Sequence, residues 1–120
     1  MTAIVIEKTH YCTNKDILEL LDICPLVIEQ IKKKEHIYRY LYDAYEDVAN
    51  QYGISLGVAI VYKGDTDNIH HYDYWYKYSD VKVDTTGVKG FKTFAKAQLE
   101  VIHQTMYELE NRINHSTNGE

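Results

Sequence analysis

Cysteine and histidine are the residues of this chain that most readily do chemistry, as nucleophiles, proton carriers or metal ligands. The two cysteines are Cys12 and Cys24, and two of the six histidines, His70 and His71, are adjacent. Zinc sites use Cys-x-x-Cys or His-x-x-x-His spacings, and this sequence contains neither. Because neighbouring residues of a strand point to opposite faces, His70 and His71 are not expected to share one ion. The sequence therefore predicts neither a metal site nor a cofactor.

The acidic pairs of the sequence are interpreted as solvated charge. Asp65 and Asp67 fall in a predicted turn, and Glu46 and Asp47 fall on the surface of a predicted helix. Cys24 lies on the apolar side of a helix, where a thiol behaves as a core residue. We therefore predict that the protein is not an enzyme.

A loop before the last predicted helix is a candidate ligand site. Its residues are Thr85, Thr86, Gly87, Lys89, Gly90, Lys92 and Thr93. Lysines at a helix N-terminus oppose the helix dipole, whereas the free N–H groups there bind phosphate. Two interpretations stay open. The loop holds a phosphate-bearing, nucleotide-like ligand, or it is a solvated loop whose lysines serve solubility.

Alternating tyrosines are the most distinctive pattern of the chain. Tyr72, Tyr74, Tyr76 and Tyr78 share one face of a predicted strand, and His71, Asp73, Trp75 and Lys77 share the other. The tyrosine face is expected to pack on a helix. On the opposite face, Trp75 lies next to the small residues Gly57 and Ala59 and can be satisfied within its own sheet. If nothing else covers this face, it is expected to form an aromatic patch that binds a partner.

Three helices are expected to position these residues. The first begins at Thr13 or Asn14, which can accept a hydrogen bond from the first turn. The second follows Pro25 and runs from 26 to about 51, with Ile37 in its buried stripe and Gly53 as its stop signal. The last is capped by Thr93 and has an apolar spacing of 4-3-4-3-4 from Ala95 to Ile113.

Strands are predicted at 3–7, at 54–62 and along the tyrosine segment, with a short addition at 81–83 and a loop at 85–90. The element order is then β-α-α-β-β-(β)-α. This order indicates an α+β domain, in which an antiparallel β-meander of three to four strands packs against two or three helices. We expect a single domain over 1–113 and a disordered tail over 114–120.

Composition restricts the function further. A net charge of −5 argues against generic binding to duplex nucleic acid, which needs clustered Lys and Arg. The apolar run 3–6 is too short for a signal peptide, and no stretch reaches the length of a membrane-spanning helix. The cysteines are therefore expected to be reduced and the protein cytoplasmic.

Two functions are expected from these observations. The first is a non-enzymatic module that binds and modulates, or inhibits, a partner protein through an aromatic, acidic sheet surface around Trp75, His71, Asp73 and Lys77. Its acidic, tyrosine-rich character without catalytic motifs is that of small phage or mobile-element accessory proteins. The alternative is a protein that sequesters a nucleotide-like ligand at the 85–93 loop. A homodimer through the free face or edges of the sheet is compatible with either.

Overall fold

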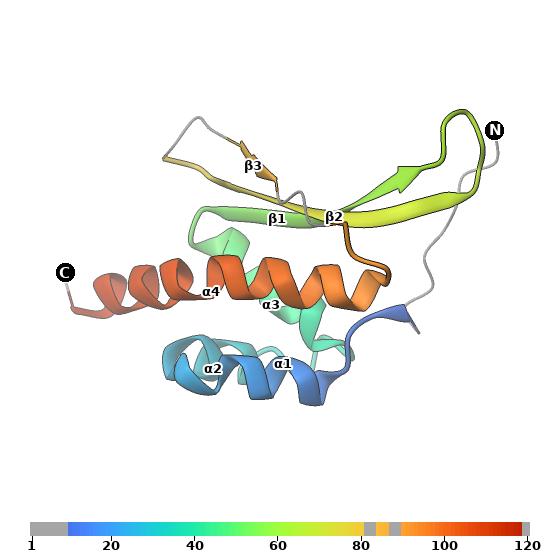
Figure 1. Ribbon diagram of the computed structural model, residues 1–120. Coiled ribbons are helices and arrows are strands. Elements are labelled where there is room, and N and C mark those ends of the chain that lie inside the picture. The colour runs from blue at the N-terminus through green and yellow to red at the C-terminus, as the bar shows by residue number, and fades with distance from the viewer. Residues whose placement is uncertain (1–9, 81–83, 87–89, 119–120) are drawn as a thin grey trace.

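The computed structural model describes residues 10–80, 84–86 and 90–118, and it places the described helices on one side of a small antiparallel sheet (Figure 1). The elements, in chain order, are α1 (Asn14–Leu20), the 3-10 helix η2 (Leu21–Ile23), α2 (Pro25–Lys32), α3 (Leu41–Gln51), β1 (Ile54–Tyr62), β2 (Ile69–Tyr78), β3 (Asp84–Thr86) and α4 (Phe94–Asn118). The prediction of an α+β fold is confirmed.

The sheet consists of two long antiparallel strands and one short strand, in the order β1-β2-β3. Ile54 lies opposite Tyr78 and Val58 opposite Tyr74. The predicted strand count and element order are confirmed only in part, because the segments 3–7 and 81–83 lie outside the described residues. Thr85 and Thr86 form part of β3 instead of the predicted loop, and they pair with Tyr76 and Trp75. Threonine is β-branched and favours a strand once a partner is available.

The predicted long helix 26–51 is wrong, because the chain forms two helices with a turn between them. Asn14 explains where the second of these helices, α3, begins. Its Oδ1 accepts a hydrogen bond from Leu41 N at 2.9 Å, and its Nδ2 donates to Arg39 O at 3.2 Å. This amide therefore caps α3 from a distant part of the chain. Ile37 lies in the turn and is 62% exposed, although its spacing predicted a buried residue.

The tyrosine face of β2 packs on the helices, as predicted. Tyr74 is buried, Tyr76 and Tyr78 pack against the core, and Tyr72 contacts the ring of Phe94 at 5.8 Å between centroids. Helix α4 lies under both long strands, and the buried side chains of its inner face include Ile102, Met106, Leu109 and Ile113. The alternation of β2 thus fixes which sheet face belongs to the core.

The ends of the helices follow partly from local signals. Thr13 and Thr93 cap α1 and α4, with their Oγ1 atoms accepting from Asp16 N and Lys96 N at 3.1 Å each, as predicted. Helix α4, however, continues to Asn118, so the predicted tail is helical from 114 to 118. Residues 114–116 are polar and exposed, but hydrogen bonds already formed in the helix favour adding further residues.

Helix α2 begins on a carboxylate that belongs to α4. Glu110 Oε2 accepts from Leu26 N at 3.1 Å, and Oε1 accepts from Val27 N at 2.9 Å. The N-terminal N–H groups of a helix have no partners within it, and the dipole favours negative charge there. This long-range cap ties α2 to α4.

Removing the side chain of Ile102, which is fully buried, should destabilise the fold. We expect Ile102→Ala to lower the free energy of unfolding by about 2–5 kcal/mol in urea titrations, because it leaves a cavity. The control residue is Tyr107, which is 57% exposed on the same helix. Tyr107→Ala should change the free energy of unfolding by less than about 0.5 kcal/mol. Equal losses would show that α4 does not pack as described.

The carboxylate of Glu110 should stabilise the protein more than a surface carboxylate does. Glu110→Ala is expected to cost about 1–3 kcal/mol, since two partly buried N–H groups lose their acceptor. The control is Glu29→Ala, which removes an exposed ion pair with Lys33 and should cost less than about 0.5 kcal/mol in the same titration. A cost for Glu110→Ala no larger than that of the control would contradict the capping role.

Candidate interaction surface

The second face of the sheet carries no described helix (Figure 1). We call it the outer sheet face; it is formed by Ser55, Gly57, Ala59 and Val61 of β1 and by His71, Asp73, Trp75 and Lys77 of β2. Four of these eight residues are those predicted to contact a partner. The register places Trp75 opposite Gly57 and Lys77 opposite Ser55, so the sheet brings the predicted residues onto one surface.

Trp75 packs on Gly57 within its own sheet. A methyl group on Gly57 would lie 2.6 Å from Nε1 and 2.8 Å from Cε2 of the indole, which is far inside van der Waals contact. The small residue is therefore required by the close approach of the ring, and this is the glycine–tryptophan packing expected from the sequence. The indole is half-buried, so part of it remains at the surface.

The other predicted contact residues differ in accessibility. Lys77 is exposed and His71 is half-buried, but Asp73 is only 8% exposed and its Oδ1 accepts a hydrogen bond from Tyr74 N at 2.8 Å. Asp73 therefore contributes little surface to a partner. The expectation of an acidic sheet surface is not supported at this position.

A change of register brings His70 and His71 together. Val61 lies opposite His71 and Tyr62 opposite Ile69, so His70 is an extra residue in β2. Such a bulge locally breaks the alternation of side chains. As a result the two Nδ1 atoms lie 2.7 Å apart, and the expectation that the two rings point to opposite faces is wrong. Within the described residues, no group of three or more His, Cys, Asp or Glu side chains is arranged to hold a metal ion.

The predicted ligand loop does not form one compact site in the described residues. Thr85 and Thr86 lie in β3, whereas Gly87 and Lys89 lie outside the described residues. Lys92 is exposed, and Gly90 adopts a φ of +69° beside the ring of His71. The hydroxyl of Thr93 already caps α4, so one N–H group of that helix start has an internal acceptor.

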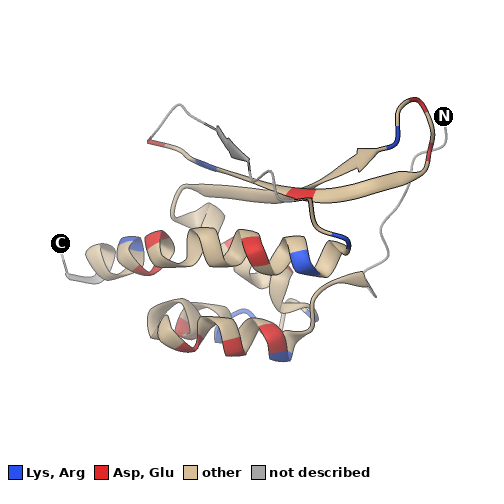
Figure 2. Ribbon diagram, in the orientation of Figure 1, with Lys and Arg blue, Asp and Glu red and all other residues tan. Residues whose placement is uncertain are grey.

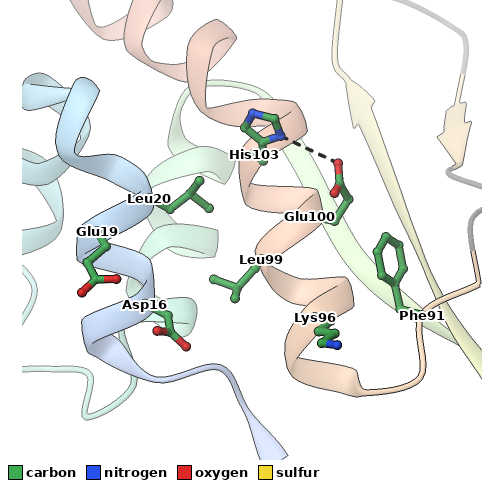
Figure 3. A pocket seen from close by; sticks show the side chains of 8 residues that line it. All are labelled: Asp16, Glu19, Leu20, Phe91, Lys96, Leu99, Glu100 and His103. Atoms are coloured by element: carbon green, nitrogen blue, oxygen red, sulfur yellow. Dashed lines mark ion pairs between the residues drawn. The ribbon is translucent and has the colours of Figure 1, made fainter.

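A groove between α1 and α4 was not predicted (Figure 3). It encloses about 710 Å³ and is lined by Asp16, Glu19, Leu20, Phe91, Lys96, Leu99, Glu100 and His103. Leu20 and Leu99 point toward each other from the two helices. Figure 2 shows Asp and Glu residues along both α1 and α4. The sequence contains these carboxylates, but nothing local in it indicates that α1 and α4 are neighbours.

The charge of this groove disfavours an anion. Three carboxylates, those of Asp16, Glu19 and Glu100, face one lysine and one histidine. Glu100 Oε2 lies 3.8 Å from His103 Nδ1, so even this imidazole is close to an acid. A phosphate-bearing ligand would therefore meet net negative charge next to Phe91 and Lys96.

Potential nucleophiles are poorly placed for catalysis. Burial raises the pKa of the Cys12 thiol to about 12 and also raises the pKa of Cys24, and a protonated thiol is a weak nucleophile. Residues 53–57 read Gly-Ile-Ser-Leu-Gly, which has the Gly-x-Ser-x-Gly spacing of a nucleophile elbow. Ser55, however, lies inside β1 opposite Lys77, and the catalytic form of this motif needs a sharp strand-to-helix turn.

Comparisons with protein-family models, with curated proteins and with solved structures give no match to this chain. Among the described residues, no helix combines the length and the apolar character that crossing a membrane requires. The function of this protein is therefore inferred from the surfaces described above.

The close contact between Gly57 and Trp75 can be tested by fluorescence, because Trp75 is the sole tryptophan of the chain. Gly57→Ala should displace the indole, move its emission to longer wavelength and lower the free energy of unfolding by about 1–3 kcal/mol. Ser55→Ala, on the same face of the same strand, is the control and should leave the emission maximum unchanged. An unchanged spectrum for Gly57→Ala would place the indole elsewhere.

Proposed function

We propose that this protein is a non-enzymatic interaction module that binds a partner protein and modulates, in particular inhibits, its activity through the outer sheet face. The observation that carries the proposal is the packing of Trp75 on Gly57. This contact holds the indole in one position before a partner arrives, so little conformational freedom is lost on binding. Tryptophan is also the residue most enriched among those that dominate binding energy.

The rest of the outer sheet face supports a flat contact area. Ala59 and Val61 add apolar surface beside Trp75, and Lys77 adds an exposed cation at one end. No described helix covers this face. The expected acidic character of this surface has less support, since Asp73 is buried.

The alternative function, sequestration of a nucleotide-like ligand, has one observation in its favour. The α1–α4 groove joins an aromatic ring, Phe91, to a lysine in the first turn of α4, Lys96. Its three carboxylates argue against a phosphate group, as described above. We therefore rank protein binding first.

Site-specific photo-crosslinking would test the proposed surface directly. A photoreactive phenylalanine analogue replaces Lys77, which is exposed on the outer sheet face, in protein expressed in its native host. The control carries the same analogue in place of Tyr107, which is exposed on α4. A discrete crosslinked partner from position 77 and not from position 107 would support the proposal, whereas the reverse would place binding on the helices.

Trp75→Ala should weaken binding to that partner by at least about tenfold, because a central tryptophan typically contributes 2 kcal/mol or more at an interface. Its melting temperature is expected to change by only a few degrees, since the ring is half-buried and lies on the sheet surface. Binding is measured by titration calorimetry, with Tyr107→Ala as the matched aromatic control. A large loss of stability with unchanged affinity would make Trp75 a purely structural residue.

A further inference from the structure

The groove between α1 and α4 has an apolar floor that the described residues leave uncovered. Leu20 and Leu99 are partly buried against the core, and Figure 3 shows the two side chains pointing toward each other from the two helices. The groove encloses about 710 Å³, and along α4 its lining residues end at His103. Two neighbouring helices with apolar side chains between them form a surface on which a further helix packs.

Acidic side chains line the α1 side of this floor. Asp16 and Glu19 are exposed and lie three residues apart, so they share one face of α1 (Figure 3). Glu19 lies 4.0 Å from Lys15, and such an exposed ion pair is weak. On the α4 side Glu100 faces the same space, and Lys96 is the one lysine among the described lining residues. The rim of the groove therefore attracts positive charge, most strongly along α1.

We propose that this groove binds a basic amphipathic helix of a partner protein. The apolar stripe of that helix packs on Leu20 and Leu99, and its lysine or arginine residues face Asp16 and Glu19. Helices of this kind bind apolar grooves through residues at positions i, i+3, i+4 and i+7. Helix α1 has seven residues and is about 10 Å long, so the groove accommodates about two turns of the bound helix. The ion pairs at the rim fix the orientation of the bound helix and speed its association.

A basic helix fits this groove better than the other occupants do. Small-ligand sites bury about 70–90% of the ligand surface, whereas no described element closes this groove from outside (Figure 3). The three carboxylates of the lining disfavour a phosphate-bearing ligand. A second copy of this chain, with its net charge of −5, would bring further acidic charge to an acidic rim. The inference does not rest on the proposed function, since it concerns the helices and not the outer sheet face.

An NMR titration of the intact protein with a synthetic peptide tests the occupant of the groove. The probe is a leucine–lysine peptide of roughly 14 residues, a length at which isolated helices begin to form, with its leucines on one helical face. The amide signals of Leu20, Leu99 and His103 should shift, and that of Trp75 should not. A peptide of the same composition in scrambled order should bind at least about tenfold more weakly. Unchanged groove signals, or equal affinity for the scrambled peptide, would overturn the inference.

Spermidine distinguishes a basic helix from a small organic cation. It carries positive charge without an apolar helical face, so the inference expects it to leave the amide signals of Leu20 and Leu99 in place. The same shifts with spermidine as with the peptide, at a comparable affinity, would assign the groove to small cations and contradict the proposal.

Neutralising the two carboxylates of α1 provides the matched variant. Asp16→Asn/Glu19→Gln keeps the shape of both side chains and should raise the dissociation constant of the leucine–lysine peptide about fivefold, the combined effect of two exposed ion pairs. The control, Asp65→Asn/Asp67→Asn, removes the same charge from the exposed turn between β1 and β2, and it should leave the dissociation constant unchanged. Equal weakening in both variants would show a response to net charge alone, and no weakening in the first would show that the peptide does not face α1. Either result would exclude the proposed binding mode.

Discussion

The packing of the tyrosine face of β2 against α4 is the constraint on which the other features of the structure depend. Because side chains of a strand alternate, burying Tyr74 under the sheet sends Trp75 to the other side. A shift of one residue would exchange the two faces and expose the tyrosines. The apolar stripe of α4, which includes Ile102 and Met106, provides the surface that makes this register the stable one.

The same constraint leaves the outer sheet face available for binding. With the described helices on one side, the sheet presents its other face, where Trp75 packs on Gly57. The residue that the proposed function depends on is thus placed at the surface by the packing of the opposite face.

The sequence predicts those features of this protein that depend on residues close to one another in the chain. Threonine caps, the strand alternation and the packing of Trp75 near Gly57 all follow from residues close in the chain or directly paired in a hairpin. Features created by distant residues could not be predicted. Asn14 ends the turn before α3, Glu110 caps α2 from α4, and the groove exists because α1 lies beside α4. The bulge at His70 is an intermediate case. It forms within a local hairpin, but one extra residue shifts the register without changing the composition of the strand, so the sequence pattern does not reveal it.

Fluorine NMR of protein labelled with 5-fluorotryptophan can show whether Trp75 lies on a binding face. The chain contains a single tryptophan, so the spectrum has one signal from this residue. In the free protein the signal should shift between H2O and D2O, because part of the ring contacts solvent. When the crosslinked partner binds, we expect the signal to move and to lose this solvent shift. A signal that keeps its position and its solvent shift in the complex would contradict this expectation.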